Sequence, residues 1–285
     1  MTESLLPMFK WTGGKRREIQ HFAPYYPEFV KNGDDYKYVE PFAGAAATFW
    51  SLNNVDGVNI VNEFDPELVN FYRQVEKQDK KFLKAVSDMA ALFSSNDSAA
   101  HDRQEAAYYE WRNKDRNNGL ASLSDADRAA RFFIVNQLAF SGMRRFNAAG
   151  EFNVPYGHYK NLNDNVLTSA AHVKLLKNTT VTEGDYKPCV LAHDTAKTFM
   201  FFDPPYTRVM KKYSADNEFG DEQQRELADT LKGLSQANWM MIIDKSDLTM
   251  DLYGDYVKHT YALSYGVNIK NRFSTAVEHI IATNY

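Results

Sequence analysis

The pattern of apolar and polar positions changes character twice along the chain. Residues 36–42 (YKYVEPF) form a short apolar run that leads into the small residues AGAAA and then into a helical pattern. A second run, residues 57–64 (GVNIVNEF), precedes PELVNFYRQVEK, where a leading proline and apolar residues three to four positions apart predict a helix. The first part of the chain therefore predicts alternating strands and helices.

From about residue 78 to 139 the pattern is helical throughout. It predicts helices over KKFLKAVSDMAALF, QEAAYYEWRNKDR and SDADRAARFFIVNQLAF, the last capped by Ser124 or Asp125. Residues 144–158 (RRFNAAGEFNVPYGH) predict instead a hairpin whose turn is NAAGE. After about residue 165 the strand and helix rhythm resumes with VKLL, NTTVTEGD, TFMFFDPPY, the helix DEQQRELADTLKGLS, and then NWMMIID, YVKHTYAL and VEHIIATNY.

The predicted strands are apolar on both faces, which is typical of a mostly parallel sheet between two layers of helices. We therefore predict a doubly wound, Rossmann-like α/β domain made of residues 1–77 and 162–285. It is interrupted by a mainly α-helical insert, residues 78–161, which carries the β-hairpin.

Composition and charge narrow the class of protein. Hydrophobic residues at 44% against 25% charged indicate a globular chain. Cys189 is the single cysteine, and no Cys/His cluster has zinc-like spacing, so we expect a reducing compartment and no metal. Without a long apolar run or a leader pattern we expect a cytoplasmic protein with no membrane partner. The net charge of −4 argues mildly against nucleic acid, although basic residues gather locally at 15–17 and 144–145.

Candidate chemistry lies at the predicted carboxyl ends of the strands, where doubly wound sheets bind their ligands. The small residues after the first strand would let a ligand approach the backbone of Gly44 and Ala45, although they would equally let a helix pack closely on the sheet. Glu63 ends the next strand, at a spacing where a carboxylate commonly binds ribose hydroxyls. Asp185 ends another strand, with a helix cap as its alternative role. Together these residues suggest a nucleoside-containing cofactor without distinguishing a dinucleotide from S-adenosylmethionine.

The sequence FFDPPY, residues 201–206, ends a buried strand with two prolines. Neither proline has a backbone donor, and Pro204 restricts Asp203 to an extended conformation, so this turn presents hydrogen-bond acceptors. Tyr206 adds a flat face for stacking. Acceptors beside an aromatic ring suit a planar, aminated ligand such as an exposed nucleobase. The alternative is a strand ended by prolines with the aspartate as a turn former.

At this point the chain resembles the Dam type of DNA adenine methyltransferases over nearly its whole length. The matching pieces, in order, are FKWTGGKR, YVEPFAGAAATFW, VNEFDPELVNFYRQV, YYEWRNKDRN, AFSGMRRFNAAGEFNVPYGHYKN, FFDPPY and NIKNRF…VEHIIATNY. The resemblance implies an S-adenosylmethionine-dependent methyltransferase sheet that acts on an adenine flipped out of double-stranded DNA. It makes the insert at 78–161 the target-recognition domain.

The resemblance also implies roles for individual residues. Asp203, Pro204, Pro205 and Tyr206 match the catalytic motif, which would hold the exocyclic amine. The residues expected at the S-adenosylmethionine are Trp11, Gly13, Gly14, Lys15, Phe42, Gly44, Glu63, Asp185, Tyr186 and Asp203. The residues expected at DNA are Lys10, Phe140, Ser141, Arg145, Asn147, Pro155 and Tyr159. Among these, Arg145 would contact a guanine and Phe140 would wedge into the space that the flipped base leaves.

Some features depart from the family pattern. The turn reads FAGAA instead of FxGxG, so alanine stands at position 46, and MMIIDKSD places Asp244 and Lys245 where members carry Ser/Asn-Asn. Phe140-Ser141 stands where bacterial members often carry Tyr-Asn, which leaves GATC as one candidate site. Alternative functions are methylation of another amino base, such as cytosine or an RNA base, DNA binding without catalysis, and, without the resemblance, a dehydrogenase. Double-stranded DNA is the expected partner, and a companion restriction endonuclease is a candidate that the sequence does not decide.

Overall fold

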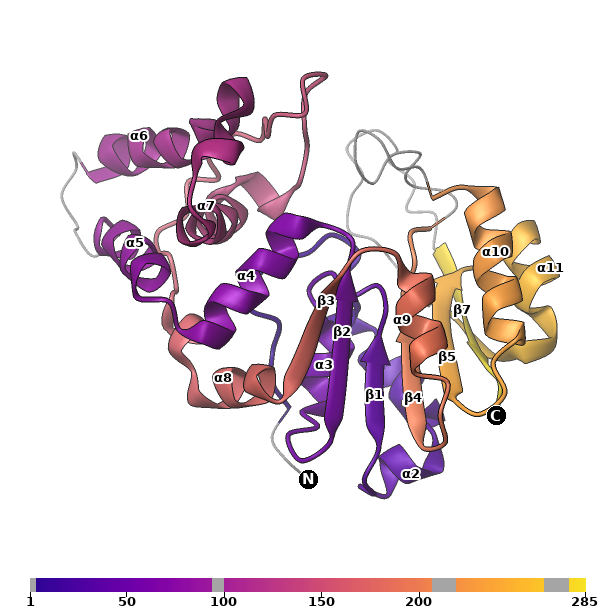
Figure 1. Cartoon of the computed structure of the whole chain (residues 1–285). Helices are drawn as coiled ribbons and strands as arrows, with labels where there is room; N and C mark the ends of the chain where they lie inside the picture. Colours follow the sequence, from indigo (N-terminus) through magenta and orange to yellow (C-terminus); the bar gives the residue numbers. More distant parts are fainter. Residues whose placement is uncertain (1–3, 94–99, 207–218, 264–276) are drawn as a thin grey trace.

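The computed structural model describes residues 4–93, 100–206, 219–263 and 277–285 (Figure 1). Its centre is a seven-stranded sheet in the order β3-β2-β1-β4-β5-β7-β6. The strands are β1 (Lys37–Glu40), β2 (Val58–Glu63), β3 (Thr179–Glu183), β4 (Thr198–Phe202), β5 (Asn238–Asp244), β6 (Val257–Leu263) and β7 (Val277–Thr283). Neighbours from β3 to β5 pair in parallel, and β7 is antiparallel to both β5 and β6. The predicted Rossmann-like α/β fold is confirmed.

Strand order reverses between β1 and β4. From β1 the chain continues outward to β2 and then β3, whereas β4 and β5 lie on the other side of β1. The loops that leave β1 and β4 therefore diverge, and such a switch point is where doubly wound sheets bind ligands. The small-residue turn follows β1 and the DPPY motif (residues 203–206) follows β4, so both lie at this point.

Successive side chains of a strand point to opposite faces of the sheet, and each face packs against its own layer of helices. In β4, Phe199 and Phe201 pack into one apolar cluster, and Met200 and Phe202 pack into the other. One face is covered by α9 (Tyr186–Ala192), α10 (Asp221–Lys232) and α11 (Asp247–Tyr253), and the other by α1 (Ile19–Phe22), α2 (Glu28–Lys31), α3 (Ala47–Leu52), α4 (Pro66–Lys77) and α8 (Ala170–Lys177) (Figure 1). The prediction of strands apolar on both faces is wrong for β3 and β6, which lie at the two edges and are partly exposed.

Helix α4 has the bounds that its sequence predicts. Pro66 occupies the first turn, where its missing N–H costs nothing, and the Asp65 side chain accepts a hydrogen bond from the Glu67 amide at 3.0 Å. Apolar residues at helical spacing form the buried face of α4, which begins with Leu68 and Val69. This helix joins the sheet to the insert.

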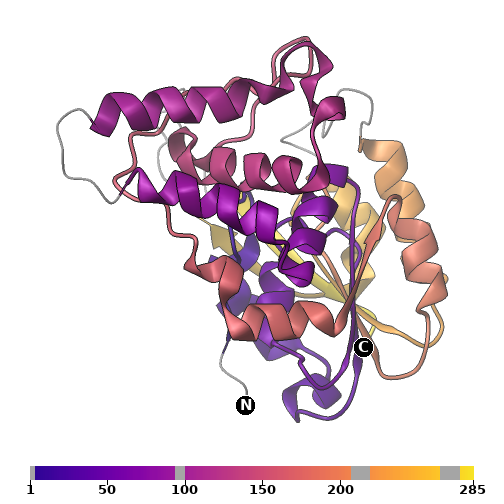
Figure 2. The same cartoon turned by 60° about the vertical axis from the view of Figure 1, so that its left-hand side comes forward.

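The insert consists of α5 (Lys80–Ala91), α6 (Ala100–Arg112) and α7 (Asp125–Leu138), and α7 packs against both α4 and α5 (Figures 1 and 2). Phe71 of α4 contacts Phe132 and Phe133 of α7, with ring centroids 5.3 and 5.8 Å apart. These rings belong to the apolar cluster that also contains Phe199 and Phe201 of the sheet. The core is therefore continuous across the predicted boundary at residue 77, because α4 is shared.

Several local predictions differ from the structure. Helix α6 ends at Arg112 rather than near 116, and the chain continues as a 3-10 segment, Asn113–Ser122, in which Asn117 and Asn118 have positive φ. VKLL lies in α8, and the pattern did not predict α9 or α11. Shorter 3-10 turns occur at Lys15–Arg17, Ala23–Tyr25, Phe140–Gly142, Asn165–Thr168 and Gly254–Tyr256.

The predicted hairpin is present as an antiparallel pair held by single bridges. Phe146 pairs with Phe152, and Ala139 pairs with Tyr156. The Asn147 amide donates to the Glu151 carbonyl at 2.9 Å, which closes the turn where NAAGE predicts it. We call residues 140–153 the hairpin arm.

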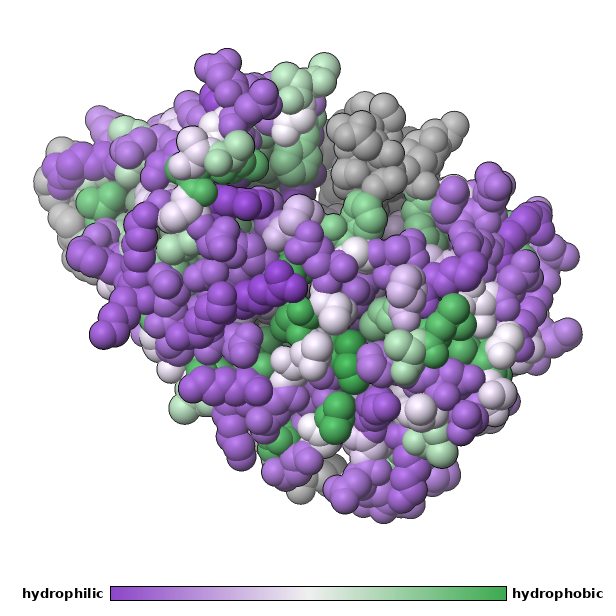
Figure 3. All heavy atoms as spheres, viewed as in Figure 1, coloured by the Kyte–Doolittle hydropathy of each residue, from purple (hydrophilic) through white to green (hydrophobic). Residues whose placement is uncertain are grey.

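The described surface is mixed. Figure 3 shows hydrophilic residues over most of one face, including the insert, with apolar residues near its middle. None of the described helices combines the length and hydropathy needed to cross a membrane.

A buried aspartate holds the hairpin arm against the helices of the insert. Asp115 accepts hydrogen bonds from the Phe152 amide at 2.7 Å and from Arg116 at 2.9 Å, and it pairs with the Arg131 guanidinium at 2.5 Å. The side chains of Asp115 and Arg131 are 5% and 8% exposed, so neither charge has water as an alternative partner.

Asp115→Ala should lower the free energy of unfolding by roughly 3–5 kcal/mol, because it leaves the Arg131 charge buried without its partner. Urea titration followed by circular dichroism measures the loss. Asp125→Ala is the control, since its carboxylate is 70% exposed and lies 3.9 Å from Arg128, and it should cost less than about 1 kcal/mol. Equal losses for the two variants would contradict this role for Asp115.

Candidate functional site at the strand ends

Gly44 is held on three sides in the turn after β1. Its amide donates to Glu63 Oε2 at 2.7 Å, and its carbonyl accepts the Tyr72 hydroxyl at 2.8 Å. A side chain at this position would place its Cβ 2.6 Å from the indole nitrogen of Trp11, and φ is +49°. Glycine is therefore required here both by the backbone conformation and by the close approach of Trp11.

Glu63 organises the end of β2. Its Oε1 accepts the amides of Phe64 at 2.9 Å and Asp65 at 3.1 Å, while Oε2 holds Gly44. Burial raises the pKa of the Glu63 carboxyl above its ordinary value, against the effect of these three amides. Each carboxylate oxygen has two lone pairs, so the group retains capacity for a ligand. Phe64 is 48% exposed beside it.

Aromatic side chains line the part of the strand-end site that lies toward β3. The Phe42 ring stacks on Tyr186 with centroids 5.0 Å apart, and Phe219 meets Phe42 edge-on at 5.6 Å. Asp185 is exposed and caps α9, accepting the Lys187 amide at 2.7 Å. Its side chain therefore has the capping role that we considered as an alternative.

The DPPY motif is fixed from both sides. Asp203 Oδ1 lies 2.8 Å from the Lys15 ammonium, and its side chain is 22% exposed. The Pro205 carbonyl accepts the side-chain amide of Gln224, a fully buried residue of α10, at 2.7 Å. Burial raises the pKa of the Asp203 carboxyl, and the Lys15 charge opposes this. The Tyr206 ring lies 4.8 Å from the same ammonium.

Lys15 is buried at 2% exposure and has a second carboxylate beside it. Glu18 Oε1 lies 3.7 Å from the ammonium, while Glu18 Oε2 accepts the Tyr261 hydroxyl at 2.7 Å and lies 2.8 Å from His279 Nδ1. Although burial opposes ionisation, the hydrogen bond to His279 and the Lys15 charge hold the pKa of Glu18 below its ordinary value. The His279 ring also supports Tyr206 edge-on, with centroids 5.1 Å apart.

Six of the seven residues expected at DNA lie on the insert, and Lys10 packs against it from the N-terminal segment. Phe140 is 48% exposed, and Ser141 follows it with φ of +55°. The exposed Arg145 side chain donates to Asn153 Oδ1 at 2.8 Å and to the Asn153 carbonyl at 3.2 Å, which orients its guanidinium. Met143 and Phe146 add exposed apolar surface on the same arm.

Other residues of this group have internal partners. The Asn147 side chain accepts the Ala149 and Glu151 amides at 3.0 and 2.9 Å, so it shapes the turn. Pro155 is exposed, and its carbonyl accepts the Phe140 amide at 2.9 Å. The Lys10 ammonium lies 3.6 Å above the Tyr159 ring.

The structure thus brings the expected residues into two sets. One set lies near the strand ends and consists of Trp11, Lys15, Phe42, Gly44, Glu63, Asp203 and Tyr206. The other consists of the hairpin arm with Pro155 and Tyr159 of the insert and with Lys10, which packs against the insert. Sequence reasoning missed Glu18, Gln224, Tyr261 and His279, whose partners are distant in the chain. The segment NIKNRF lies outside the described residues.

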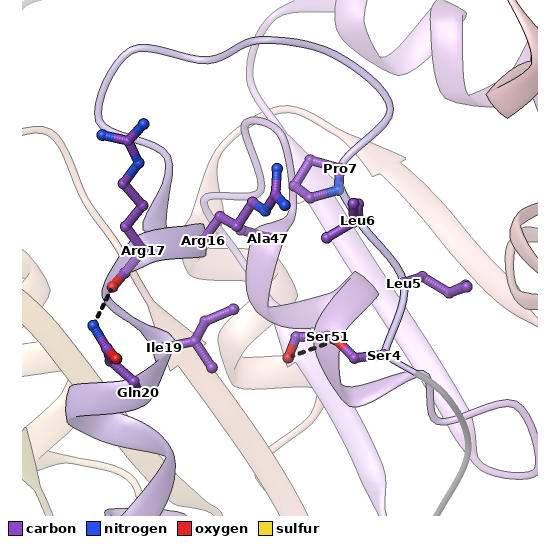
Figure 4. Close-up of a pocket in the computed structure, with 10 residues that line it drawn as sticks. All are labelled: Ser4, Leu5, Leu6, Pro7, Arg16, Arg17, Ile19, Gln20, Ala47 and Ser51. Carbon is purple, nitrogen blue, oxygen red and sulfur yellow. Dashed lines mark hydrogen bonds between the residues drawn. The ribbon is translucent and has the colours of Figure 1, made fainter.

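Two further features do not belong to this site. A cavity of about 550 Å³ lies between the N-terminal residues and α3 and is lined by Leu6, Arg16 and Ser51, among others (Figure 4). None of the strand-end carboxylates lines it.

His101, Glu105 and His158 gather on the insert, where their ligand atoms lie within 4.8 Å of one another. The two imidazole rings are nearly parallel, at 5°, with nitrogens 2.9 Å apart. The nitrogens therefore hydrogen-bond each other instead of converging on a third point, so we assign no metal to this cluster.

The glycine turn, the acidic end of β2 and the acceptor-rich DPPY motif lie at the switch point, the place where doubly wound α/β proteins bind their ligands. The family model of the D12 class N6 adenine-specific DNA methyltransferases matches residues 11–268, and the chain belongs to this family. It is therefore a DNA adenine methyltransferase, an enzyme class that uses a methyl donor of the S-adenosylmethionine type.

Relatives match almost end to end. The type II methyltransferase M.CviBI of Paramecium bursaria Chlorella virus NC1A is 30% identical over 98% of this chain and 99% of its own length. The type II methyltransferase M1.LlaDCHI of Lactococcus lactis subsp. cremoris is 29% identical over 99% and 96%. The DNA adenine methylase of Escherichia coli K12 is 25% identical over 96% and 93%.

Glu40, a further buried carboxyl group at the end of β1, should make the stability of the fold depend on pH. It accepts the Tyr38 hydroxyl at 2.8 Å and the Phe49 amide at 3.2 Å, and burial raises its pKa from 4.5 to about 8. Since the folded chain holds this proton more tightly than the unfolded chain, the contribution is complete below pH 4.5 and is lost as the pH rises through about 8.

Glu40→Gln should therefore flatten the decline in unfolding free energy between pH 4.5 and about 8, because the amide cannot release a proton. Urea titrations across this range measure the slope. Glu28→Gln, at a side chain that is 79% exposed, should keep the wild-type slope. A Glu40→Gln slope equal to wild type would contradict the assignment.

Proposed function

We propose that the protein transfers a methyl group from S-adenosylmethionine to the exocyclic amine of an adenine in a short duplex DNA site. The observation that carries the proposal is the placement of Asp203 at the switch point, beside the ring of Tyr206 and on the same edge of the sheet as Gly44 and Glu63. Membership of an adenine-specific family supports the choice of base.

The strand-end residues fit S-adenosylmethionine. Three backbone amides occupy three of the four lone pairs of the Glu63 carboxylate, and the remaining lone pair on Oε2 suits a ribose hydroxyl. The nearby carboxyl groups of Glu63 and Asp203 favour a cationic ligand in their ionised forms. The donor supplies an electrophilic methyl group on a positively charged sulfur. The chain's proposed contacts to it are Trp11, Lys15, Phe42, Gly44, Glu63, Asp185, Tyr186 and Asp203.

Asp203 and the Pro204 carbonyl would accept hydrogen bonds from the adenine amine and orient its lone pair. The Lys15 ammonium at 2.8 Å favours the ionised form of Asp203, which accepts such bonds. Extraction of the base costs a few kcal/mol, and stacking on Tyr206 would return about 1–3 kcal/mol of this. Holding the two reactants in line then supplies much of the rate.

We assign recognition of the DNA base sequence to the insert. Arg145 would contact a guanine, Phe140 and Ser141 would occupy the space of the flipped base, and GATC is the candidate site. Asn147 and Pro155 would act by shaping the arm, given their internal hydrogen bonds. Lys10 and Tyr159 would complete the surface.

The direct test is incubation with methyl-labelled S-adenosylmethionine and adenine-containing duplexes, followed by digestion and identification of the modified nucleoside. N6-methyl-2′-deoxyadenosine in a defined sequence context is the expected result. Label in a cytosine or RNA base would favour another amino acceptor, and no label in any context would refute the proposal.

Asp203→Asn should reduce methyl transfer by about 100-fold or more, because the amide lacks the charge that orients the amine. Binding of S-adenosylhomocysteine, measured by calorimetry, should remain within a few-fold of wild type. Asp221→Asn, at an exposed residue in the first turn of α10, is the control and should retain full activity. Full activity of Asp203→Asn would exclude the role given to this carboxylate.

Arg145→Ala should lower discrimination between the preferred duplex and duplexes with one substituted base pair by about 1–3 kcal/mol. The ratio of kcat/KM values for the two duplexes measures it. Arg103→Ala removes the same charge from an exposed position on α6 and should leave this ratio unchanged. Equal effects of the two variants would mean that Arg145 supplies charge without reading a base.

A further inference from the structure

Arg144 precedes the proposed base-reading residue but contacts the strand-end site. Its Nη2 lies 2.5 Å from Asp65 Oδ2, and its guanidinium carbon lies 4.9 Å from the centre of the Trp11 ring. The side chain is 27% exposed, so this pair is partly shielded from solvent. Arg144 thus joins the hairpin arm to two segments that border Gly44.

The first route from Arg144 to the glycine turn runs through an aromatic ring. The guanidinium faces Trp11, a contact of the kind that stabilises by cation–π attraction. The Trp11 indole in turn packs directly on Gly44, where even one added methyl group would collide with it. The position of this ring therefore affects the surface that Gly44 presents.

The second route runs through a carboxylate and a backbone amide. Asp65 binds Arg144 with Oδ2 and caps α4 with Oδ1, while its own amide donates to Glu63 Oε1 at 3.1 Å. Glu63 then holds the Gly44 amide with its other oxygen. Both routes from Arg144 therefore converge on Gly44.

We infer that Arg144 is a positioning residue that couples DNA binding by the insert to cofactor binding at the strand ends. The inference rests on the proposed function. Residues 144 and 145 are joined by one peptide, so engagement of Arg145 with a base fixes the backbone from which Arg144 extends. A fixed Arg144 holds Trp11 and Asp65, and through them Gly44 and Glu63, in the arrangement that the cofactor needs.

Coupling of this kind is reciprocal, so DNA should tighten cofactor binding by the same factor by which cofactor tightens DNA binding. A residue that merely stabilised the contact between insert and sheet would change stability without changing this factor. The factor therefore separates coupling from a purely structural role.

Arg128 provides a matched control. It also joins the insert to α4, with Nε 2.8 Å from Glu67 Oε1, and its side chain is 27% exposed like that of Arg144. The contacts of Arg128 are with Glu67 and Asp125, not with Trp11 or Asp65. Arg128→Gln removes a comparable interaction while leaving both routes intact.

The experiment measures the affinity for S-adenosylhomocysteine by calorimetry, with and without a short duplex that the wild type methylates. Wild type and Arg128→Gln should show tighter binding with DNA, within the ~5–150-fold range typical of coupled sites. Arg144→Gln should bring the factor close to 1. Asp65→Asn, which keeps a competent helix cap, should also reduce the coupling factor. If Arg144→Gln does not fold, the factor measured for Asp65→Asn tests the inference.

A wild-type factor of 1, an unchanged factor in Arg144→Gln, or equal losses in Arg144→Gln and Arg128→Gln would overturn the inference. Failure of the proposed function is distinct from these outcomes, because it would already appear as absence of methyl transfer by the wild type.

Discussion

The ion pair between the buried Lys15 ammonium and Asp203 is the interaction on which the strand-end site depends. The ammonium lies between Asp203 and Glu18, which come from different parts of the chain, and its position fixes the N-terminal segment against the DPPY motif. Removing a charged group from water is costly unless the group has a specific partner. Each charged group here has one, and for Glu18 it includes His279. These contacts hold the geometry of the motif from within the protein.

The outer layers of the fold support this arrangement at a distance. Gln224 of α10 holds the Pro205 carbonyl from one side of the sheet, and His279 of β7 supports the Tyr206 ring. On the other side, α4 packs its apolar face against both the sheet and α7. The insert therefore shares the core of the sheet, which connects the hairpin arm mechanically to the strand-end residues.

Sequence patterns predicted the elements whose signals are local. Helix α4 matched residue for residue because Asp65 and Pro66 specify its start and its apolar spacing is regular, and the hairpin turn followed from NAAGE. The ends of β1, β2 and β4 also placed Gly44, Glu63 and Asp203 on one edge. Partners separated by more than 200 residues, such as Glu18 with Tyr261 and His279, leave no periodic signal. In the sequence Arg144 is only one of two adjacent basic residues, and its contacts with Asp65 and Trp11 are visible only in the folded chain.

Ala46 stands where the family pattern has a second glycine, yet it adopts φ of +51° and is 1% exposed. For an alanine this left-handed conformation costs roughly 1–2 kcal/mol, so the surrounding packing must impose it. The turn has therefore kept the shape of a glycine turn without the flexibility of glycine. The shape of this turn is therefore a property of the core around it, and a change in the neighbouring side chains would be felt at the strand-end site.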